Sequence, residues 1–379
     1  MNSNNQGNNQ ENDVKNIDIV IGMAQKTDPK NLVVFCASLR KHSNAELVLF
    51  VSNPISDLSK KIIEKYKVNA IPFNLEDLPQ QMRSFHPSTY RWYLIYHFFQ
   101  KNANKYRNVW MIDVRDSYFQ SDPFAIITSN PSQTSQFHVF QGVDMPIGQC
   151  GWNGPWISDC FGNEMLQYVG PNTIICSGVS VGTIDVVSSY LSRINSILEG
   201  NTIMPYITTN KYPTCERNGV DQGIHNVLVY TNQIKNMKIW SQSNSPVLNL
   251  QSRSANVQGN IVKNLNNEIA AVVHQYDRYP DLQKQLFKEY VDWVDTSDPM
   301  AEWNQEIECT KYDYVFEKDL FKGKCDYKIK GGATGPSSCC GFCNEFSECA
   351  AFTFYNGQCF LKTQCGKPSS GPYLQGAVS

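Results

Sequence analysis

The chain has 379 residues, of which 41% are hydrophobic, 12% aromatic and 18% charged, and its formal net charge is −2. That length predicts two or three domains, and that composition argues against a largely disordered chain. Because no block of basic residues and no apolar run of about 18 residues occurs, we expect neither a nucleic-acid partner nor a membrane-spanning segment. No apolar run follows Met1, so no signal peptide is expected in this chain.

Thirteen cysteines divide the sequence unevenly, with five before residue 300 and eight between Cys309 and Cys365. Small cysteine-dense units depend on disulfides, so we expect a large domain at 17–300 and a disulfide-rich α+β module at 301–379. Residues 1–16 contain almost no apolar side chains and are expected to form a disordered leader. Disulfides favour the secretory-pathway lumen or the extracellular space, although Pro131 disqualifies the one N-glycosylation match, at Asn130.

Short β-branched runs alternate with amphipathic segments through the first domain. Asp28 followed by Pro29 is typical of a helix start, and apolar residues at helical spacing continue from there. This alternation predicts an α/β fold of the Rossmann-like kind, with a mostly parallel sheet, helices on both faces and a ligand site at the carboxyl ends of the strands. In chain order we expect strands at 17–23, 45–51, 68–73, 108–113, 136–141, 172–182 and 268–276, and helices at 29–42, 54–66, 88–106, 183–199, from 221, and at 280–293.

Two acids and a histidine follow predicted strands. Asp113 and Asp116 lie where the strand 108–113 ends, and His274 closes the late strand. Two carboxylates at the carboxyl end of a central strand can share one hard cation, and an imidazole favours Mn²⁺ over Ca²⁺. Two simpler interpretations stay open: a turn in which Asp116 pairs with Arg115, and a structural histidine.

Four segments, taken in order, resemble nucleotide-diphospho-sugar transferases of the GT-A fold, and among these a plant-like glycosyltransferase group: WMIDVRDSYFQSDPF, CSGVSVGT, GVDQGIHNVLVY and VVHQYDR. The resemblance covers about residues 17–295. It implies a metal-dependent glycosyltransferase with Mn²⁺ or Mg²⁺ as cofactor. Such an enzyme would move a hexose or pentose from a nucleotide-sugar, a UDP-sugar before a GDP-sugar, to a hydroxyl on a glycan or glycoprotein.

The resemblance also assigns the metal ligands, which would be Asp113, Asp116 and His274. The acids of this chain are three residues apart, whereas the acidic motif of the family has them two apart. Asp116 is therefore the more secure ligand, and Asp113 could instead hold the ribose or stand outside the metal shell.

Donor-binding positions follow from the same resemblance. Gly22, Met23 and Ala24 would receive the nucleotide base, or else form an ordinary strand-to-helix turn. Arg91 would reach the diphosphate or the sugar, or else be a solvated helix charge. Asp113 could contact the ribose. Ser177 and Gly178 would line the donor sugar, because glycine lets the backbone approach a ligand, or else mark a β-bulge.

The catalytic and acceptor positions complete the implied site. Asp221 would act as a base on the acceptor or stabilise positive charge on the sugar, with Gln222 beside it; the alternative for Asp221 is a helix N-cap. Trp152 and Trp156 would form the acceptor site, since aromatic faces stack on sugars. They could instead plug a surface loop that is closed by a disulfide between Cys150 and Cys160.

The cysteine-rich tail resembles a PAN/apple module, with a helix in CCGFCNEF and strands in CAAFTFY and QCFLK. A zinc site using Cys340 and Cys343 is the alternative. Two other functions stay open for the whole chain. One is a carbohydrate-binding or adhesion protein built on a degenerate transferase domain. The other is a nucleotidyltransferase, for which the Gly-rich basic signature near the first strand is missing.

Overall fold

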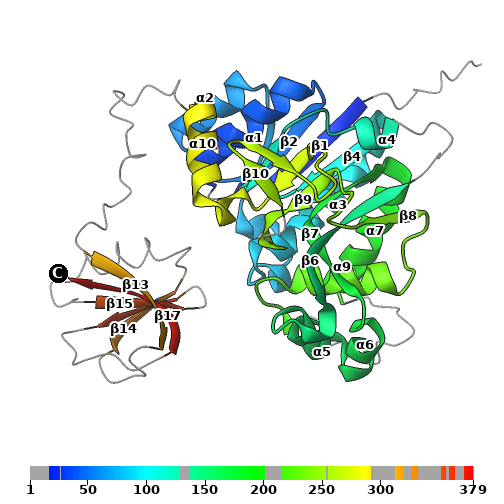
Figure 1. The fold of residues 1–379 in the computed structure, drawn as a ribbon. Coiled ribbons are helices and arrows are strands. Elements are labelled where there is room, and N and C mark those ends of the chain that lie inside the picture. The colour runs from blue at the N-terminus through cyan, green and yellow to red at the C-terminus, as the bar shows by residue number, and fades with distance from the viewer. Residues whose placement is uncertain are drawn as a thin grey trace, which may run out of the picture. The chain divides into compact units, whose positions relative to one another are not determined.

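The computed structural model describes residues 17–25, 27–128, 136–200, 215–252 and 255–291, together with the backbone of five strands after residue 311. The chain divides into two compact units, Met1–Val294 and Asp295–Ser379 (Figure 1). The expected leader at 1–16 lies outside the described residues. Among the described helices, none is both long enough and apolar enough to cross a membrane.

A seven-stranded sheet forms the centre of the first unit, in the order β3-β2-β1-β4-β7-β6-β8. Neighbouring strands are parallel except where β7 pairs antiparallel with β4 and β6. This arrangement confirms the expected α/β class and the mostly parallel sheet. The strands are β1 (Ile17–Met23), β2 (Glu46–Ser52), β3 (Asn69–Phe73), β4 (Tyr106–Ile112), β6 (Phe137–Pro146), β7 (Thr173–Thr183) and β8 (Met237–Trp240).

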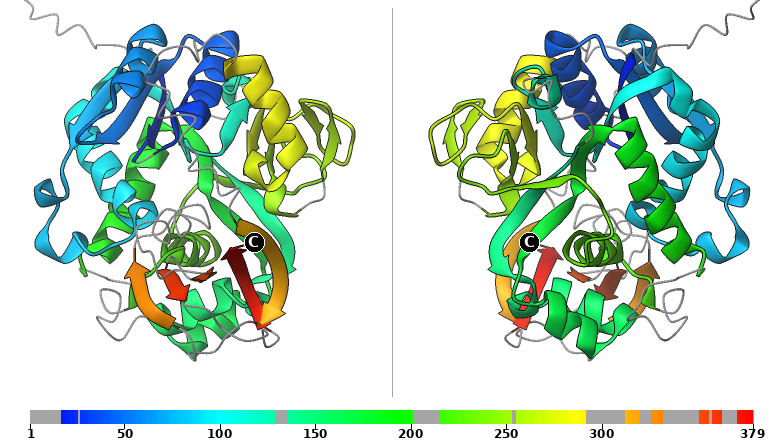
Figure 2. Two further views of the ribbon diagram at one scale, coloured as in Figure 1. Left: turned by 90° about the vertical axis from the view of Figure 1, so that its left-hand side faces the viewer. Right: turned by 90° about the vertical axis from the view of Figure 1, so that its right-hand side faces the viewer.

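Helices cover both faces of the sheet, as expected (Figure 2). On one face α1 packs against α2 and α10, and on the other α3, α7 and α9 pack against one another. The helices are α1 (Pro29–His42), α2 (Asp57–Lys65), α3 (Pro87–Asn102), α4 (Ala125–Thr128), α5 (Asn153–Phe161), α6 (Asn163–Val169), α7 (Ile184–Leu198), α9 (Val220–Tyr230) and α10 (Pro280–Val291).

Local capping explains where the first helices begin. Helix α1 has the predicted bounds because the Asp28 carboxylate accepts a hydrogen bond from Lys30 N at 2.8 Å and Pro29 occupies the first turn. Helix α2 was expected to begin at residue 54, and this is wrong. Ser56 is its N-cap and accepts a hydrogen bond from Ser59 N at 3.1 Å, so the first helical residue is Asp57.

The late strand is much shorter than the predicted range 268–276. Strand β12 spans Val272–His274 and is the middle strand of a small second sheet, between β5 (Ser117–Phe119) and β9 (Val247–Asn249). In this sheet His274 pairs with Ser117 on one side and Asn249 on the other. The pairing fixes the histidine beside the acids that follow β4. A hairpin of β10 (Asn256–Gln258) and β11 (Ile261–Lys263) lies between β9 and β12 in the chain.

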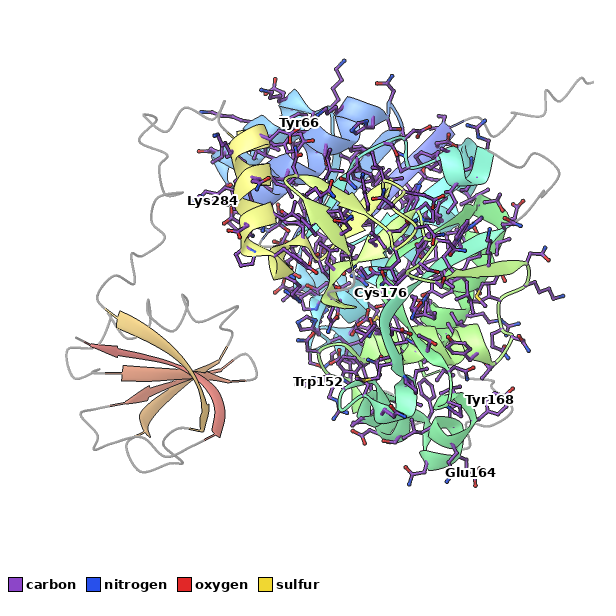
Figure 3. All side chains as sticks on the ribbon, viewed as in Figure 1. Tyr66, Trp152, Glu164, Tyr168, Cys176 and Lys284 are labelled. Carbon is purple, nitrogen blue, oxygen red and sulfur yellow. A yellow bond between two sulfur atoms is a disulfide. The ribbon has the colours of Figure 1, made fainter. Side chains whose placement is uncertain are left out.

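A helical corner built from α5 and α6 follows β6. Trp152 lies at its start and Tyr168 near its end, on opposite sides in the view of Figure 3. The disulfide between Cys150 and Cys160, which was the alternative for this segment, is wrong, because Cys160 bonds Cys215. Cys150 precedes α5 and Cys160 lies in its last turn, roughly 10 Å further along the axis, which is beyond the Cα–Cα reach of a disulfide.

The second unit contains a five-stranded antiparallel sheet in the order β13-β17-β15-β16-β14. Both strands predicted for the tail occur, as β15 and β16. The helix expected in CCGFCNEF, the cysteine pairings of the tail and the zinc alternative lie outside the described residues. The strands are β13 (Tyr312–Asp319), β14 (Asp326–Gly331), β15 (Ala351–Tyr355), β16 (Gln358–Lys362) and β17 (Gly371–Val378).

Candidate active site

Asp113, Asp116 and His274 converge at the carboxyl end of β4. Asp113 directly follows β4, Asp116 directly precedes β5, and His274 ends β12, which pairs with β5. One ligand atom from each residue lies within 4.8 Å of the other two. His274 Nε2 is 3.5 Å from Asp113 Oδ2 and 3.4 Å from Asp116 Oδ1. The structure thus brings together three residues that are up to 161 positions apart in sequence.

The far side of the imidazole determines which nitrogen faces the acids. Asn249 Nδ2 donates to the Gln141 carbonyl at 2.9 Å, which turns Asn249 Oδ1 toward His274 Nδ1 at 2.8 Å. Because Oδ1 only accepts, Nδ1 carries the proton and donates it. In the neutral ring Nε2 therefore presents its lone pair to the carboxylates, and such outer hydrogen bonds typically orient a metal-binding histidine.

The donor atoms at this site fit a divalent metal. Asp116 is 4% exposed, and its Oδ1 is buried without a hydrogen-bond partner among the described residues. Its Oδ2 accepts from Arg115 Nη2 at 2.7 Å, so the alternative of an Arg115 pair holds for one oxygen only. Two carboxylates and one imidazole suit Mn²⁺ better than Ca²⁺. The wider spacing of the acids does not prevent Asp113 from joining the cluster.

Charges within the cluster shift both buried groups. Burial lowers the pKa of His274, but electrostatic interactions with Cys176 and Asp116 raise it by more, to about 9. Burial raises the pKa of Asp116, but His274 and Arg115 lower it by more, to about 2. Without a metal, His274 is therefore an imidazolium at neutral pH and compensates the carboxylates, and a metal must displace its proton.

We expect Mn²⁺ binding at pH 7 to release about one proton, because Nε2 must lose its proton to become a ligand. The affinity should then rise about tenfold per pH unit and level off near the pKa of His274, which is about 9. Calorimetry in two buffers with different ionisation enthalpies measures the released proton. His274→Gln should bind the ion more weakly and show no such release. Equal heats in both buffers for the wild type would contradict this assignment.

Gly178, in β7, lies directly against the metal-binding cluster. A Cβ atom at this position would stand 2.6 Å from Asp113 Oδ2 and 2.9 Å from His274 Nε2, and closer still to His274 Cε1. The Gly178 carbonyl also accepts a hydrogen bond from Asp113 N at 2.7 Å. This glycine is therefore required for the approach of β7 to two candidate ligands.

Gly178→Ala should weaken Mn²⁺ binding by about 10- to 100-fold, the usual effect of disturbing the residues that orient metal ligands. Gly142→Ala is the matched control, because Gly142 lines the same cavity but its added Cβ would find its nearest neighbour at 3.5 Å. Calorimetry gives the two affinities and circular dichroism tests whether both variants fold. Wild-type affinity in folded Gly178→Ala would show that the cluster does not hold the ion.

Arg91, on α3, joins the cluster to Asp221. It is 8% exposed and forms an ion pair with Asp113 Oδ1 through Nη1 and with Asp221 Oδ2 through Nη2, the latter at 3.1 Å. Nη2 also donates to the Ser177 carbonyl at 3.4 Å. The interpretation of Arg91 as a solvated helix charge is therefore wrong. Its guanidinium is already committed to two carboxylates, so its first role is to position them.

Asp221 is a buried acid in the first turn of α9 and not its cap. The N-cap is Gly219, whose φ of +90° suits glycine, and Asp221 follows as the second helical residue without a capping bond. Its Oδ2 instead accepts from Ser177 Oγ at 2.9 Å and from Arg91. The alternative of a helix N-cap is therefore wrong, because the helix begins before this residue.

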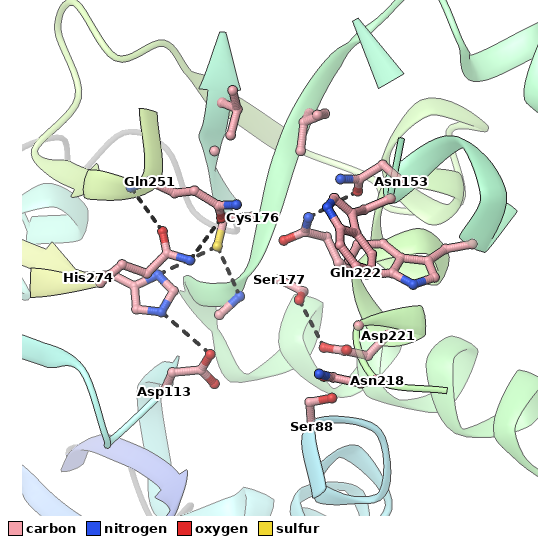
Figure 4. Close-up of a pocket in the computed structure, with 18 of the residues that line it drawn as sticks. Ser88, Asp113, Asn153, Cys176, Ser177, Asn218, Asp221, Gln222, Gln251 and His274 are labelled. Carbon is pink, nitrogen blue, oxygen red and sulfur yellow. Dashed lines mark hydrogen bonds and ion pairs between the residues drawn. The ribbon is translucent and has the colours of Figure 1, made fainter. Parts of the chain in front are cut away.

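A cavity of about 260 Å³ links these groups (Figure 4). That volume is just below the range of about 300–1,000 Å³ that is typical of small-molecule sites. Of the residues expected from the sequence, the cavity wall contains Arg91, Asp113, Trp152, Trp156, Ser177, Gly178, Asp221, Gln222 and His274. Asp116 is buried and does not line the cavity.

Gly22, Met23 and Ala24 do not line this cavity. Gly22 and Met23 belong to β1 itself, and a Cβ at Gly22 would stand 2.5 Å from the Ile112 carbonyl, so this glycine lets β1 lie close to β4. Ala24 N donates to the Phe50 carbonyl at 2.8 Å. The three residues nevertheless occupy the carboxyl end of the strand that neighbours β4.

The sequence interpretation missed several residues of the site. Arg278 lines the cavity and its Nη1 is 2.9 Å from Asp277 Oδ2; it belongs to the motif VVHQYDR, where its charge was the available signal. Asn153 also lines the cavity and accepts from Gln222 Nε2 at 3.0 Å. Asn249 orients His274, but nothing in the sequence around Asn249 indicates this role except its position at the end of a strand.

No family model and no curated protein matches the sequence. Similar solved structures include the following three. Galactosyltransferase LgtC, in complex with donor and acceptor sugar analogues, is 9% identical with a TM-score of 0.46, covering 76% of this chain and 99% of its own. Core-mannan synthase A from Aspergillus fumigatus, in an Mn/GDP form, is 13% identical with a TM-score of 0.35. The match covers 60% of this chain and 73% of the synthase chain. An active-site mutant of LgtC is 11% identical with a TM-score of 0.38. The match covers 68% of this chain and 86% of the mutant chain. Since all three TM-scores are below 0.5, the function has to be inferred from the site itself.

Proposed function

We propose that this chain is a metal-dependent glycosyltransferase of the GT-A type, which uses Mn²⁺ or Mg²⁺ and transfers a hexose or pentose from a UDP-sugar to a hydroxyl acceptor. One observation carries the proposal. Asp113, Asp116 and His274 meet at the carboxyl edge of a mostly parallel sheet, and two of them line a cavity that is also lined by a buried acid, Asp221. Open α/β sheets bind ligands at this edge.

The charged side of the cavity is suited to a diphosphate. A divalent cation held by the three ligands would neutralise charge on the departing diphosphate. Arg278, on the same wall, would bind a phosphate oxygen, since guanidinium groups donate two parallel hydrogen bonds to such oxygens. Arg91 would keep Asp113 aligned with the metal and Asp221 aligned with the sugar. The base would lie toward Gly22, Met23 and Ala24, at the carboxyl end of β1.

The sugar would lie between this charged side and Asp221. Ser177 and Gly178 would line it, and Ser177 holds the Asp221 carboxylate by a hydrogen bond of 2.9 Å. Asp221 would then either accept the proton of the attacking hydroxyl or stabilise positive charge on the sugar. Asp221 lies in the first turn of α9, where the free N–H groups and the helix dipole interact favourably with negative charge.

The oxidised state of Cys160 and Cys215 supports a location in the secretory pathway or outside the cell. Structural disulfides persist in these compartments and are rare in the cytosol. We propose that the tail is a PAN/apple-like module that recruits a glycan or glycoprotein acceptor.

The proposed activity is tested with a panel of UDP-glucose, UDP-galactose, UDP-N-acetylglucosamine, UDP-xylose and GDP-mannose. Each donor is incubated with Mn²⁺, Mg²⁺ or EDTA, and free nucleotide is measured. We expect UDP release from one donor, dependent on the metal. Release of GDP alone would refute the UDP assignment. If no donor is cleaved under any condition, the carbohydrate-binding alternative would replace the enzyme.

A further inference from the structure

Opposite the metal cluster, next to Asp221, part of the cavity wall is formed by uncharged side chains. Asn153 and Gln222 lie opposite Asp113 and His274 across the cavity in Figure 4. Trp152 and Trp156 line the cavity beside them. We call these four residues, Trp152, Asn153, Trp156 and Gln222, the neutral side. A ligand that occupies both ends must therefore change from charged to neutral along its length.

Trp156 is fixed over the first turn of α9. A Cβ at Gly219 would stand 2.8 Å from Cε2 of the indole and closer still to two other ring atoms. A Cβ at Gly223 would stand 3.0 Å from Trp156 Cβ. The two glycines thus leave the space into which this tryptophan packs. Since Asp221 lies between them in the same turn, Trp156 has a fixed position relative to the candidate catalytic acid.

Trp152 is exposed, but it stands at the start of a helix whose position is fixed. Its side chain is 66% exposed, and its ring centroid lies 6.2 Å from that of Trp156 at an angle of 38°. Helix α5, which begins next to it, is fixed to α9 by the Asn153–Gln222 hydrogen bond and to the segment before α9 by the Cys160–Cys215 disulfide. A large aromatic surface on a rigid support binds ligands with little loss of conformational entropy.

Polar groups flank this aromatic surface. Asn153 is 4% exposed, and its Oδ1 accepts from Gln222 Nε2 at 3.0 Å. That bond fixes the orientation of the Gln222 amide, and among the described residues nothing donates to Gln222 Oε1. The neutral side therefore combines a flat apolar face with an oriented acceptor for a hydroxyl.

We propose that the neutral side is an acceptor subsite for a neutral saccharide, in which one pyranose ring stacks on Trp152 and a ring hydroxyl donates to Gln222. This inference rests on the proposed function, because it places the acceptor opposite the donor diphosphate. A pyranose has an apolar face of C–H groups bordered by hydroxyls, which matches this surface. A serine or threonine of a peptide has no such flat face. A phosphorylated acceptor would find no cation among these four residues, and Arg217, which does not line the cavity, is already paired with Asp159 at 2.7 Å.

The subsite is tested by binding, without donor or metal, so that the result does not depend on transfer. Cellobiose, lactose, xylobiose and mannobiose are titrated into the full chain by calorimetry and saturation-transfer NMR. We expect one of these disaccharides to bind saturably and Trp152→Ala to weaken its binding about tenfold. Trp152→Phe should restore most of the affinity, because a flat ring is what the contact requires.

Tyr168→Ala is the matched control, since Tyr168 is also an exposed aromatic residue, at 58%, on the same helical corner but outside the cavity wall. It should bind the disaccharide as the wild type does. Unchanged affinity in folded Trp152→Ala, binding of none of the four disaccharides, or tighter binding of a Ser/Thr peptide would overturn the subsite. The protein could bind a disaccharide in a Trp152-dependent way and yet cleave no donor. That result would support the subsite and contradict the transferase activity.

Discussion

Asp116→Asn is expected to lower the rate of metal-dependent donor cleavage by about a hundredfold or more, the scale of several kcal/mol that a metal contributes to charge stabilisation. Asp116 Oδ1 is buried, lacks a hydrogen-bond partner among the described residues and lies 3.4 Å from His274 Nε2. An amide at this position has the same shape and can still accept from Arg115, but it no longer contributes negative charge to the cation.

The measurement is nucleotide release at increasing Mn²⁺ concentration, with the melting temperature of each variant recorded beside it. Asp281→Asn serves as the control, because this acid is exposed in the first turn of α10 and belongs neither to the cluster nor to the cavity wall. We expect Asp281→Asn to retain the wild-type rate and Asp116→Asn to lose it even at saturating Mn²⁺. A folded Asp116→Asn variant with full Mn²⁺-dependent activity would contradict the metal assignment.

Asp221→Asn should lower sugar transfer by about a hundredfold or more, which is the scale of lost acid–base catalysis. The amide oxygen can still accept from Ser177 Oγ and Arg91, so the folded structure and the affinity for UDP with Mn²⁺ should be kept. Ser177→Ala is the informative comparison, since it removes one of the hydrogen bonds to Asp221 Oδ2 but keeps the carboxylate charge. Its loss of rate should be distinctly smaller.

Single-turnover transfer and calorimetry with UDP separate the chemical step from binding in these variants. If Asp221→Asn transferred sugar at the wild-type rate, Asp221 would serve only as the partner of Arg91. Two other acids near the helical corner, Asp144 and Asp159, are then poor candidates for the catalytic group. Asp144 is exposed and accepts from Gln141, Asp159 pairs with Arg217, and neither lies on the cavity wall.

The sequence predicted the parts of the fold that local chemistry determines. The Asp28 cap and Pro29 define the start of α1, and the alternating segments define the sheet and its helical faces. The acids at the end of β4 were visible for the same reason, since they directly follow a long apolar strand. The strand β12 was not delimited, because three residues have no usable periodicity and their conformation depends on pairing with β5 and β9.

Contacts between distant segments could not be predicted. Arg91 and Asp221 are 130 residues apart, and neither neighbourhood indicates that they form an ion pair across the centre of the site. The same holds for Asn249, whose amide orients His274, and for the disulfide that joins Cys160 to Cys215 rather than to Cys150. Packing of α3 and of α5 against α9 determines the first and the last of these pairs, and pairing of β9 with β12 determines the contact between Asn249 and His274.

The most direct test of the metal-dependent mechanism is a crystal of the protein grown with Mn²⁺ and UDP and measured at the manganese absorption edge. We predict an anomalous difference peak within about 2.3 Å of Asp116 Oδ1 and His274 Nε2, with the diphosphate of UDP on its open side. Asp113 should lie at the same ion. A manganese peak elsewhere, or UDP bound in the cavity with no ion between these side chains, would contradict the account.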